Sequence, residues 1–193
     1  MKSVCVFCGS NPGKNPAYAA AAREMGTLLA SQGRTLVFGG GKVGIMGEIA
    51  DAALELGGKV IGVIPDFLMA REVGHREVTE MIVTTSMHIR KQHMADVSDG
   101  FMVLPGGIGT LDEFCEILTW RQLGLHRKPV GFLNTAGYWD PMLAFFRHMV
   151  EEGFFGEMQF SHMLVSDDPA TLLQLMDDFS IPPSAHPLRP DQV

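Results

Sequence analysis

Cysteine is scarce in this chain, whose 193 residues include only Cys5, Cys8 and Cys115. So low a count argues against the disulfide framework of a small secreted domain. Cys5 and Cys8 have the spacing of a redox pair, but such a pair normally opens a helix, and these two lie in an apolar run typical of a strand. Their odd offset there points them to opposite faces. We therefore expect both to pack in the core.

Basic residues are also in short supply, with 15 lysines and arginines against 22 aspartates and glutamates and a formal net charge of −7. A negative protein repels the phosphate backbone of a nucleic acid, so we expect no nucleic-acid partner. A single small phosphorylated ligand, held by a loop and an arginine, is compatible with this charge.

Long apolar runs are missing. The longest stretch without a charged side chain, residues 100–111, is interrupted by glycines and is shorter than the roughly 18 residues needed to cross a bilayer. The N-terminus carries one lysine and too short an apolar run for a signal peptide. We therefore expect a cytoplasmic protein with no membrane partner.

Several catalytic motifs are absent as well. Lys42 lacks the following serine or threonine of a Walker loop, and no Gly-x-Ser-x-Gly elbow occurs. His88 and His93 are five residues apart, on different faces of a predicted helix, which is not metal-ligand spacing. We therefore expect neither a metal site nor serine-hydrolase chemistry, and we expect no cofactor.

What is present is a regular alternation of short apolar runs and longer periodic stretches. The runs that predict strands are residues 3–8, 35–38, 59–64, 81–84, 100–104, 129–133 and 163–165. The stretches that predict helices are residues 16–31, 45–56, 86–97, 111–122, 139–151 and 169–179. This order predicts an α/β fold, a single-domain, Rossmann-like open parallel sheet with helices on both faces.

Two regions depart from the alternation. Residues 65–80 have no clear period, and we expect a charged, exposed segment there that includes Arg71, Glu72, His75, Arg76 and Glu77. Four prolines after Ile181 predict a flexible tail over residues 181–193. The expected domain, a nucleotide-binding one, therefore covers residues 1–180.

A glycine-rich loop joins the run at 100–104 to the next helix. Pro105 ends the strand without needing a hydrogen-bond donor, and the glycines at 106, 107 and 109 let backbone approach a ligand closely. Thr110 can cap the helix or contact a phosphate oxygen. A strand that turns directly into a helix leaves backbone N–H groups pointing at one spot, which attracts phosphate.

Glu113 lies one turn beyond this loop. A carboxylate beside a bound phosphate is repelled by it, so its position requires an explanation. One explanation is structural, a capping box formed by Thr110 and Glu113. The other is catalytic.

Two further loops, Gly9-Ser10 and residues 39–47, also follow predicted strands, where open parallel sheets bind ligands. Arg90, on the helix after the fourth predicted strand, offers a planar fork of donors suited to phosphate or a heterocycle, although an isolated arginine is more often a surface charge. Met87 shares its helix face and can pack against a flat base or in the core. The candidate binding residues are Gly9, Ser10, Gly40, Gly41, Met87, Lys91, Gly106, Gly107, Gly109 and Thr110.

The second glycine loop also matches a dinucleotide fingerprint. Gly39, Gly41 and Gly44 have its spacing, and Asp66 follows at about the expected distance. The match is weak because it falls on the second strand unit, not the first. A nicotinamide-dependent enzyme remains one alternative.

Residues 105–113 (PGGIGTLDE), together with residues 86–91 (SMHIRK), resemble the Lonely Guy (LOG) family of cytokinin riboside 5′-monophosphate phosphoribohydrolases. Further similar segments make the likeness cover most of the chain: residues 5–10, 38–47, 119–124 and 128–131. Relatives are often labelled lysine decarboxylases, but no pyridoxal phosphate site is visible among the six lysines.

The resemblance implies hydrolysis of the N-glycosidic bond of a cytokinin-type purine nucleoside 5′-monophosphate or AMP, releasing the base and ribose 5-phosphate. It implies catalytic roles for Arg90 and Glu113, and a homodimer with sites near the subunit interface. Ile108 stands where a tyrosine is common in the family, and Asp112 where a glutamate often stands. The other alternative is a non-catalytic nucleotide or molybdenum-cofactor carrier of the same fold.

Overall fold

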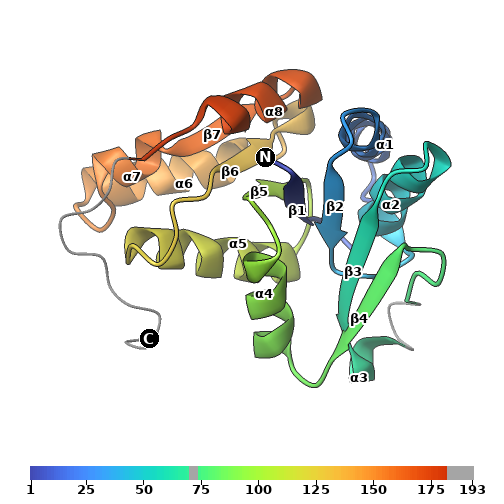
Figure 1. Cartoon of the computed structure of the whole chain (residues 1–193). Coiled ribbons are helices and arrows are strands. Elements are labelled where there is room, and N and C mark those ends of the chain that lie inside the picture. The colour runs from blue at the N-terminus through green and yellow to red at the C-terminus, as the bar shows by residue number, and fades with distance from the viewer. Residues whose placement is uncertain (70–73, 182–193) are drawn as a thin grey trace.

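Seven parallel strands form one sheet in the computed structural model, which describes residues 1–69 and 74–181 (Figure 1). The strands are β1 (Ser3–Phe7), β2 (Thr35–Phe38), β3 (Val60–Pro65), β4 (Glu80–Thr84), β5 (Gly100–Val103), β6 (Val130–Leu133) and β7 (Met163–Ser166). Every strand expected from the sequence is present, and the predicted α/β parallel sheet is confirmed. The expected tail beyond Ile181 and the residues Arg71 and Glu72 lie outside the described ranges.

The strand order places a break in chain direction at the middle of the sheet. From one edge to the other the order is β4-β3-β2-β1-β5-β6-β7. The chain moves outward from β1 to β4, then returns to add β5 on the other side of β1. Ligands of open α/β sheets bind outside the carboxyl ends of the strands at such a reversal. Here it lies between β1 and β5.

The predicted helices are also present, with shifts of one to three residues at their ends. They are α1 (Ala17–Ser31), α2 (Gly44–Glu55), α4 (Met87–Asp96), α5 (Ile108–Gln122), α6 (Asp140–Glu151) and α8 (Pro169–Asp178). Three short elements were not predicted, because they hold too few turns to show a period: α3 (Asp66–Met69), the 3-10 turn Thr135–Gly137 and α7 (Glu157–Ser161). Within the described ranges, no helix has the length and apolarity required to cross a membrane.

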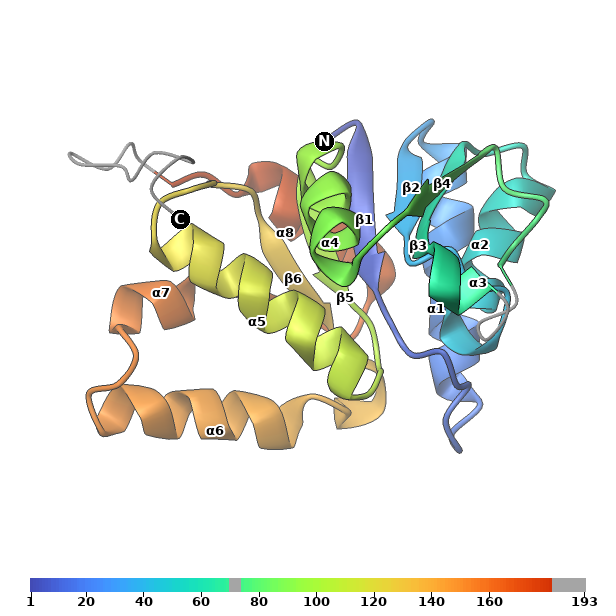
Figure 2. The same ribbon diagram turned by 90° about the horizontal axis from the view of Figure 1, so that it is seen from below.

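Each face of the sheet carries its own core, and Figure 2 shows the two helical layers flanking the strands. One core packs β1 and β2 against α1, α2 and α8, and the other packs β5 and β6 against α4, α5 and α6. Cys8 belongs to the first core and Cys5 to the second, and both thiols are free and buried. The expectation that these cysteines point to opposite faces and pack in the core is confirmed.

The contact between helices α1 and α2 depends on Gly26. A Cβ at this position would overlap the carbonyl oxygen of Ile49 on α2 and press on Ala52. The opposing groups are backbone and a short side chain, so they have little room to move.

Gly26→Ala should therefore lower the free energy of unfolding by about 1–3 kcal/mol through overpacking, although alanine is the better helix former. Urea denaturation of both proteins measures the difference. Ala20→Gly, on the exposed side of the same helix, is the control, with a loss of about 1 kcal/mol from propensity alone. An unchanged or raised midpoint for Gly26→Ala would contradict the close contact.

A second long-range tie joins α8 to the start of β2. Both terminal guanidinium nitrogens of Arg34 donate to Asp177, Nη1 to Oδ1 at 2.8 Å and Nη2 to Oδ2 at 2.6 Å. These bonds, with the Met1 amino group, lower the pKa of the Asp177 carboxyl to about 2. A carboxyl whose pKa is depressed on folding stabilises the folded state above its unfolded pKa of about 4 and loses that contribution as the pH falls through the folded value.

We expect Asp177→Asn to cost about 1 kcal/mol of unfolding free energy at pH 7, because the pair is partly solvent-screened. The difference from wild type should be constant from pH 7 to 5, shrink below pH 4 and vanish below pH 2. Denaturant midpoints across this range measure it. The exposed Asp167 provides the control variant Asp167→Asn, which should shift stability by less than about 0.5 kcal/mol.

Candidate active site

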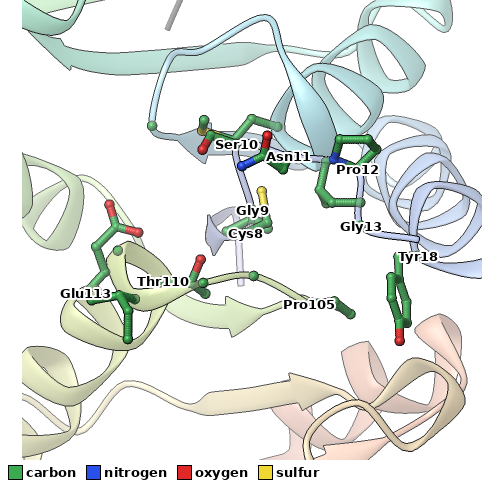
Figure 3. A pocket seen from close by; sticks show the side chains of 18 of the residues that line it. Cys8, Gly9, Ser10, Asn11, Pro12, Gly13, Tyr18, Pro105, Thr110 and Glu113 are labelled. Carbon is green, nitrogen blue, oxygen red and sulfur yellow. The ribbon is translucent and has the colours of Figure 1, made fainter. Parts of the chain in front are cut away.

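A cavity of about 500 Å³ opens at the carboxyl ends of the strands, where the sheet order reverses (Figure 3). Its size is that of a small-molecule site. Three loops contribute to its wall: the one after β1, the start of the one after β2, and the one after β5. In Figure 3, Glu113 lies at one end and Tyr18 at the other. The lining residues proposed from the sequence are Gly9, Ser10, Met87, Arg90, Gly106, Gly107, Gly109, Thr110 and Glu113.

The loop after β5 points the first turn of α5 at the cavity. Gly107 is the N-cap, with φ −103° and ψ −153°, and it makes no side-chain cap. Thr110 is the third helical residue and is 3% exposed. The capping-box alternative for Thr110 and Glu113 is therefore wrong, because the helix begins earlier than that box requires. The early N–H groups of the helix, together with the positive end of its dipole, favour an anion here.

This loop is packed tightly against its neighbour after β1. The Gly9 N–H donates to the carbonyl of Pro105 at 3.1 Å. A Cβ on Gly106 would overlap the Thr110 side chain, and one on Gly9 would press on the backbone of Gly106. Glycine is required at both positions so that the two backbones can meet.

Tyr138 fixes the same loop from the far side and was missed by the sequence analysis. Its hydroxyl donates to the carbonyl of Gly106 at 2.5 Å. Its ring packs edge-on against Tyr18 at 5.3 Å between centroids, and both rings line the cavity. The sequence places Tyr138 after the predicted strand at 129–133, but only the structure shows that this strand, β6, lies beside β5 and its glycine loop.

Arg90 and Glu113 meet inside the cavity. Nη2 of Arg90 lies 3.2 Å from Oε1 of Glu113, and the two side chains are 6% and 9% exposed. The same nitrogen donates to the carbonyl of Gly39 at 3.4 Å, while Nη1 lies 3.7 Å from the sulfur of Met87. Arg90 is the only cationic side chain that lines the cavity among the described residues. A buried charge requires such pairing, since burying an unpaired ion is strongly unfavourable.

Cys8 also lines the cavity but is held as a thiol. Burial raises its pKa well above the usual value, and the negative charge of Glu113 raises it further, with Arg90 opposing. The thiolate is the reactive form of cysteine, so Cys8 is unsuited to act as a nucleophile.

Three residues nominated from the sequence lie outside the cavity wall. Lys91 follows Arg90 on α4 but is turned about 100° around the helix, where it pairs with Asp112 at 3.1 Å and Glu116 at 3.0 Å. Gly40 and Gly41 face away from the cavity, Gly40 toward Ile64 and Met81 on β3 and β4, and Gly41 in a bridge to Gly74. The loop reaches the cavity through Gly39 and then through Ile45 and Met46 on α2.

The prediction that the segment at 65–80 is exposed is wrong for His75. His75 is completely buried, with its Nε2 2.8 Å from Asp51 Oδ1. With Glu77 these residues place three ligand-type atoms within 4.8 Å of one another. A spacing rule along the sequence misses this group because its members come from a helix and a separate loop.

The comparisons with known proteins agree on one family. A family model described as "Possible lysine decarboxylase" matches residues 46–176. The cytokinin riboside 5′-monophosphate phosphoribohydrolase LOG1 of Arabidopsis thaliana is 47% identical over 180 residues, covering 93% of this chain and 84% of that protein. The probable cytokinin riboside 5′-monophosphate phosphoribohydrolase LOGL9 of rice is 47% identical over 180 residues, covering 93% of this chain and 79% of that protein.

Solved structures share the fold at lower identity. The molybdenum cofactor carrier protein of Chlamydomonas reinhardtii superposes with a TM-score of 0.69 at 23% identity, over 92% of this chain and 96% of that one. The molybdenum cofactor binding protein of Rippkaea orientalis gives 0.66 at 21% identity, over 92% and 96%. At these identities the likeness concerns the fold alone. The family model that matches this chain is the one described as possible lysine decarboxylase. Together with the relatives at 47% identity, this match shows that the chain belongs to the LOG family.

Proposed function

We propose that this protein hydrolyses the N-glycosidic bond of a purine nucleoside 5′-monophosphate, releasing the free base and ribose 5-phosphate. The observation that carries the proposal is the buried Arg90–Glu113 pair, which faces the same cavity as the N-terminal turn of α5. An anion-binding turn beside a carboxylate is what such a substrate needs. The LOG relatives at 47% identity, named as phosphoribohydrolases, support the same reaction.

The phosphate would be bound by the α5 turn. Gly107, Gly109 and Thr110 offer backbone N–H groups and a hydroxyl, and Ser10 adds a second hydroxyl at the rim. Arg90 is already engaged by Glu113, so the cavity offers no other cation for the phosphate among the described residues. Backbone dipoles then carry most of the recognition.

The base would lie along the apolar part of the wall. Flat rings pack well against methionine and branched aliphatic side chains, which adapt to their outline. The apolar residues that line the cavity include Ile45, Met46, Leu68, Met87 and Ile108. Arg90 borders this wall through its contact with the sulfur of Met87, so it can reach a ring nitrogen of the base.

In the reaction, a water oxygen bonds to the anomeric carbon of the ribose while the bond from that carbon to the base nitrogen breaks. The base leaves with the bonding electrons and takes up a proton. Positive charge develops on the ribose ring, where the Glu113 carboxylate can stabilise it or accept the proton of the water. Arg90 can donate to the departing base, which gains negative charge.

Decarboxylation of lysine would need a different site. Pyridoxal chemistry begins with a lysine that forms a Schiff base with the cofactor. No lysine lines the cavity among the residues the structure describes, and Lys91 is held outside it by two carboxylates. The family description therefore has no chemical counterpart in this cavity.

Subunit organisation is part of the proposal. We expect a homodimer with its sites near the interface, supported by two exposed apolar side chains: Ile108, which lines the cavity, at 81%, and Ile89, on α4 beside Arg90 in sequence, at 51%. Light scattering of the purified protein measures its mass in solution, and a monomer at working concentration would contradict the dimer.

A cytoplasmic location is supported by three cysteines without a disulfide.

The direct test is incubation of the protein with AMP and with N6-isopentenyladenosine 5′-monophosphate, followed by chromatography of free base and ribose 5-phosphate. Release from either substrate supports the hydrolase, and the ratio of rates identifies the preferred base. Binding of both nucleotides without release would instead favour the carrier alternative.

Glu113→Gln should retain nucleotide binding and lower kcat by about 100-fold or more, because the amide has lost the charge that stabilises the ribosyl cation. Steady-state kinetics and calorimetry measure the two quantities. Glu116→Gln, one turn away on α5 and outside the cavity, is the matched control and should leave kcat unchanged. Full turnover by Glu113→Gln would eliminate the assigned role.

Thr110→Val should weaken AMP binding about 10-fold while leaving adenosine binding unchanged, since the substitution removes a hydroxyl but preserves shape. Calorimetric titration with both ligands measures the contrast. Thr119→Val, on an exposed part of the same helix, is the control. Equal losses for AMP and adenosine would place the phosphate elsewhere.

A further inference from the structure

His75 is a buried titratable side chain that the reaction outlined above does not use. It lies in a segment of charged residues, yet none of its surface is exposed. Its ring stands edge-on to Phe38 at the end of β2, with 6.5 Å between centroids. Burying an imidazole completely requires partners for both ring nitrogens.

Both nitrogens have partners. Nδ1 accepts from the N–H of Glu77 at 3.3 Å, so in the neutral ring the proton is on Nε2. Nε2 faces Asp51 Oδ1 at 2.8 Å, and the Glu77 carboxylate pairs with Lys42 at 2.8 Å. This hydrogen-bond pattern accounts for the cluster of Asp51, His75 and Glu77 without a metal ion, because the ligand atoms already have other partners.

The same segment fastens the loop after β2 at three successive residues. The His75 N–H donates to the carbonyl of Gly40 at 2.8 Å. Gly41 forms a bridge with Gly74, and Lys42 pairs with Glu77. Asp51, on α2, thereby holds the His75 ring, and the backbone around that ring holds the loop.

The loop in turn contacts the catalytic arginine directly. The carbonyl of Gly39, the residue before Gly40, accepts from Nη2 of Arg90 at 3.4 Å. A Cβ on Gly39 would overlap this nitrogen, so the backbone packs against the guanidinium itself. The same nitrogen is the one that meets Glu113 at 3.2 Å. A shift of the loop therefore changes the position of Arg90 relative to its carboxylate.

We propose that Asp51 and His75 are a positioning pair that sets the Arg90 guanidinium for catalysis by fixing the loop at Gly39–Lys42. The inference rests on the proposed hydrolase function. Neither side chain lines the cavity, so the pair acts through the loop and not on the substrate. Misplacing a catalytic group by about 1 Å can lower a rate by about 100-fold.

Two substitutions of His75 distinguish the roles of its two ring nitrogens. His75→Gln can place its amide N–H near the position of Nε2, toward Asp51, whereas the shorter side chain of His75→Asn places its amide oxygen near the position of Nδ1 and does not extend to that of Nε2. We expect kcat for AMP to fall about 10-fold in His75→Asn, with KM within about 2-fold, and to recover most of the loss in His75→Gln. Asp51→Ala should match His75→Asn. Glu55→Gln, one turn along α2 and exposed, is the control and should leave kcat unchanged.

A double-mutant cycle asks whether the effect passes through Arg90. In an Arg90→Lys background, His75→Asn should lower kcat by less than about 2-fold, because the group that it positions is already gone. Hydrogen exchange should rise in the peptide with residues 39–44 in His75→Asn, and not in Glu55→Gln. Equal losses of kcat from His75→Asn in the wild-type and Arg90→Lys backgrounds would overturn the proposal. An unchanged kcat in His75→Asn despite faster hydrogen exchange at residues 39–44 would also overturn it. Recovery of His75→Asn by added zinc would overturn it as well.

Failure of the proposed function gives a separate result. If wild type releases no base from either nucleotide, the hydrolase is rejected. The positioning role is then tested by hydrogen exchange alone. Exchange should rise in His75→Asn at residues 39–44 and at residues 87–94, on the helix that carries Arg90. Exchange confined to the first peptide would reject the link to Arg90 independently of catalysis.

Discussion

The buried ion pair of Arg90 and Glu113 is the interaction on which the rest of the site depends. Two opposite charges under 10% exposed are stable only where geometry and further polar contacts compensate for lost hydration. The carbonyl of Gly39 supplies such a contact, and the loop that bears it is held by Asp51 and His75. Glycine at position 39 thus lets backbone, not a side chain, approach this pair.

Local patterns made the fold predictable. Alternating apolar runs and helical periods located each long element to within a few residues, and the loop at 104–110 was correctly placed before the helix that became α5. The order of the strands could not be obtained in the same way, because it depends on which runs pair across the sheet. The same limit explains the missed Tyr138. Lys91 lies outside the cavity wall because it is turned around α4 from Arg90, and Gly40 and Gly41 lie outside it because their backbone packs toward β3, β4 and Gly74.

His75 illustrates a different limit. Charged neighbours in the sequence suggested exposure, but burial depends on what another part of the chain presents. Asp51 lies on a helix 24 residues earlier, and only the fold brings it to the ring. The molybdenum cofactor proteins share this fold at 21–23% identity, and fold alone does not determine function.

The reversal in strand order also determines when Arg90 and Glu113 can meet during folding. Arg90 belongs to the last helix of the β1–β4 half, and Glu113 to the first helix of the β5–β7 half. They meet only after β5 has inserted beside β1, a pairing such as Val4 with Gly100 that closes almost a hundred residues of chain. Such non-local pairing is slow to form. Until β5 is synthesised and paired, therefore, Arg90 has no Glu113 carboxylate beside it.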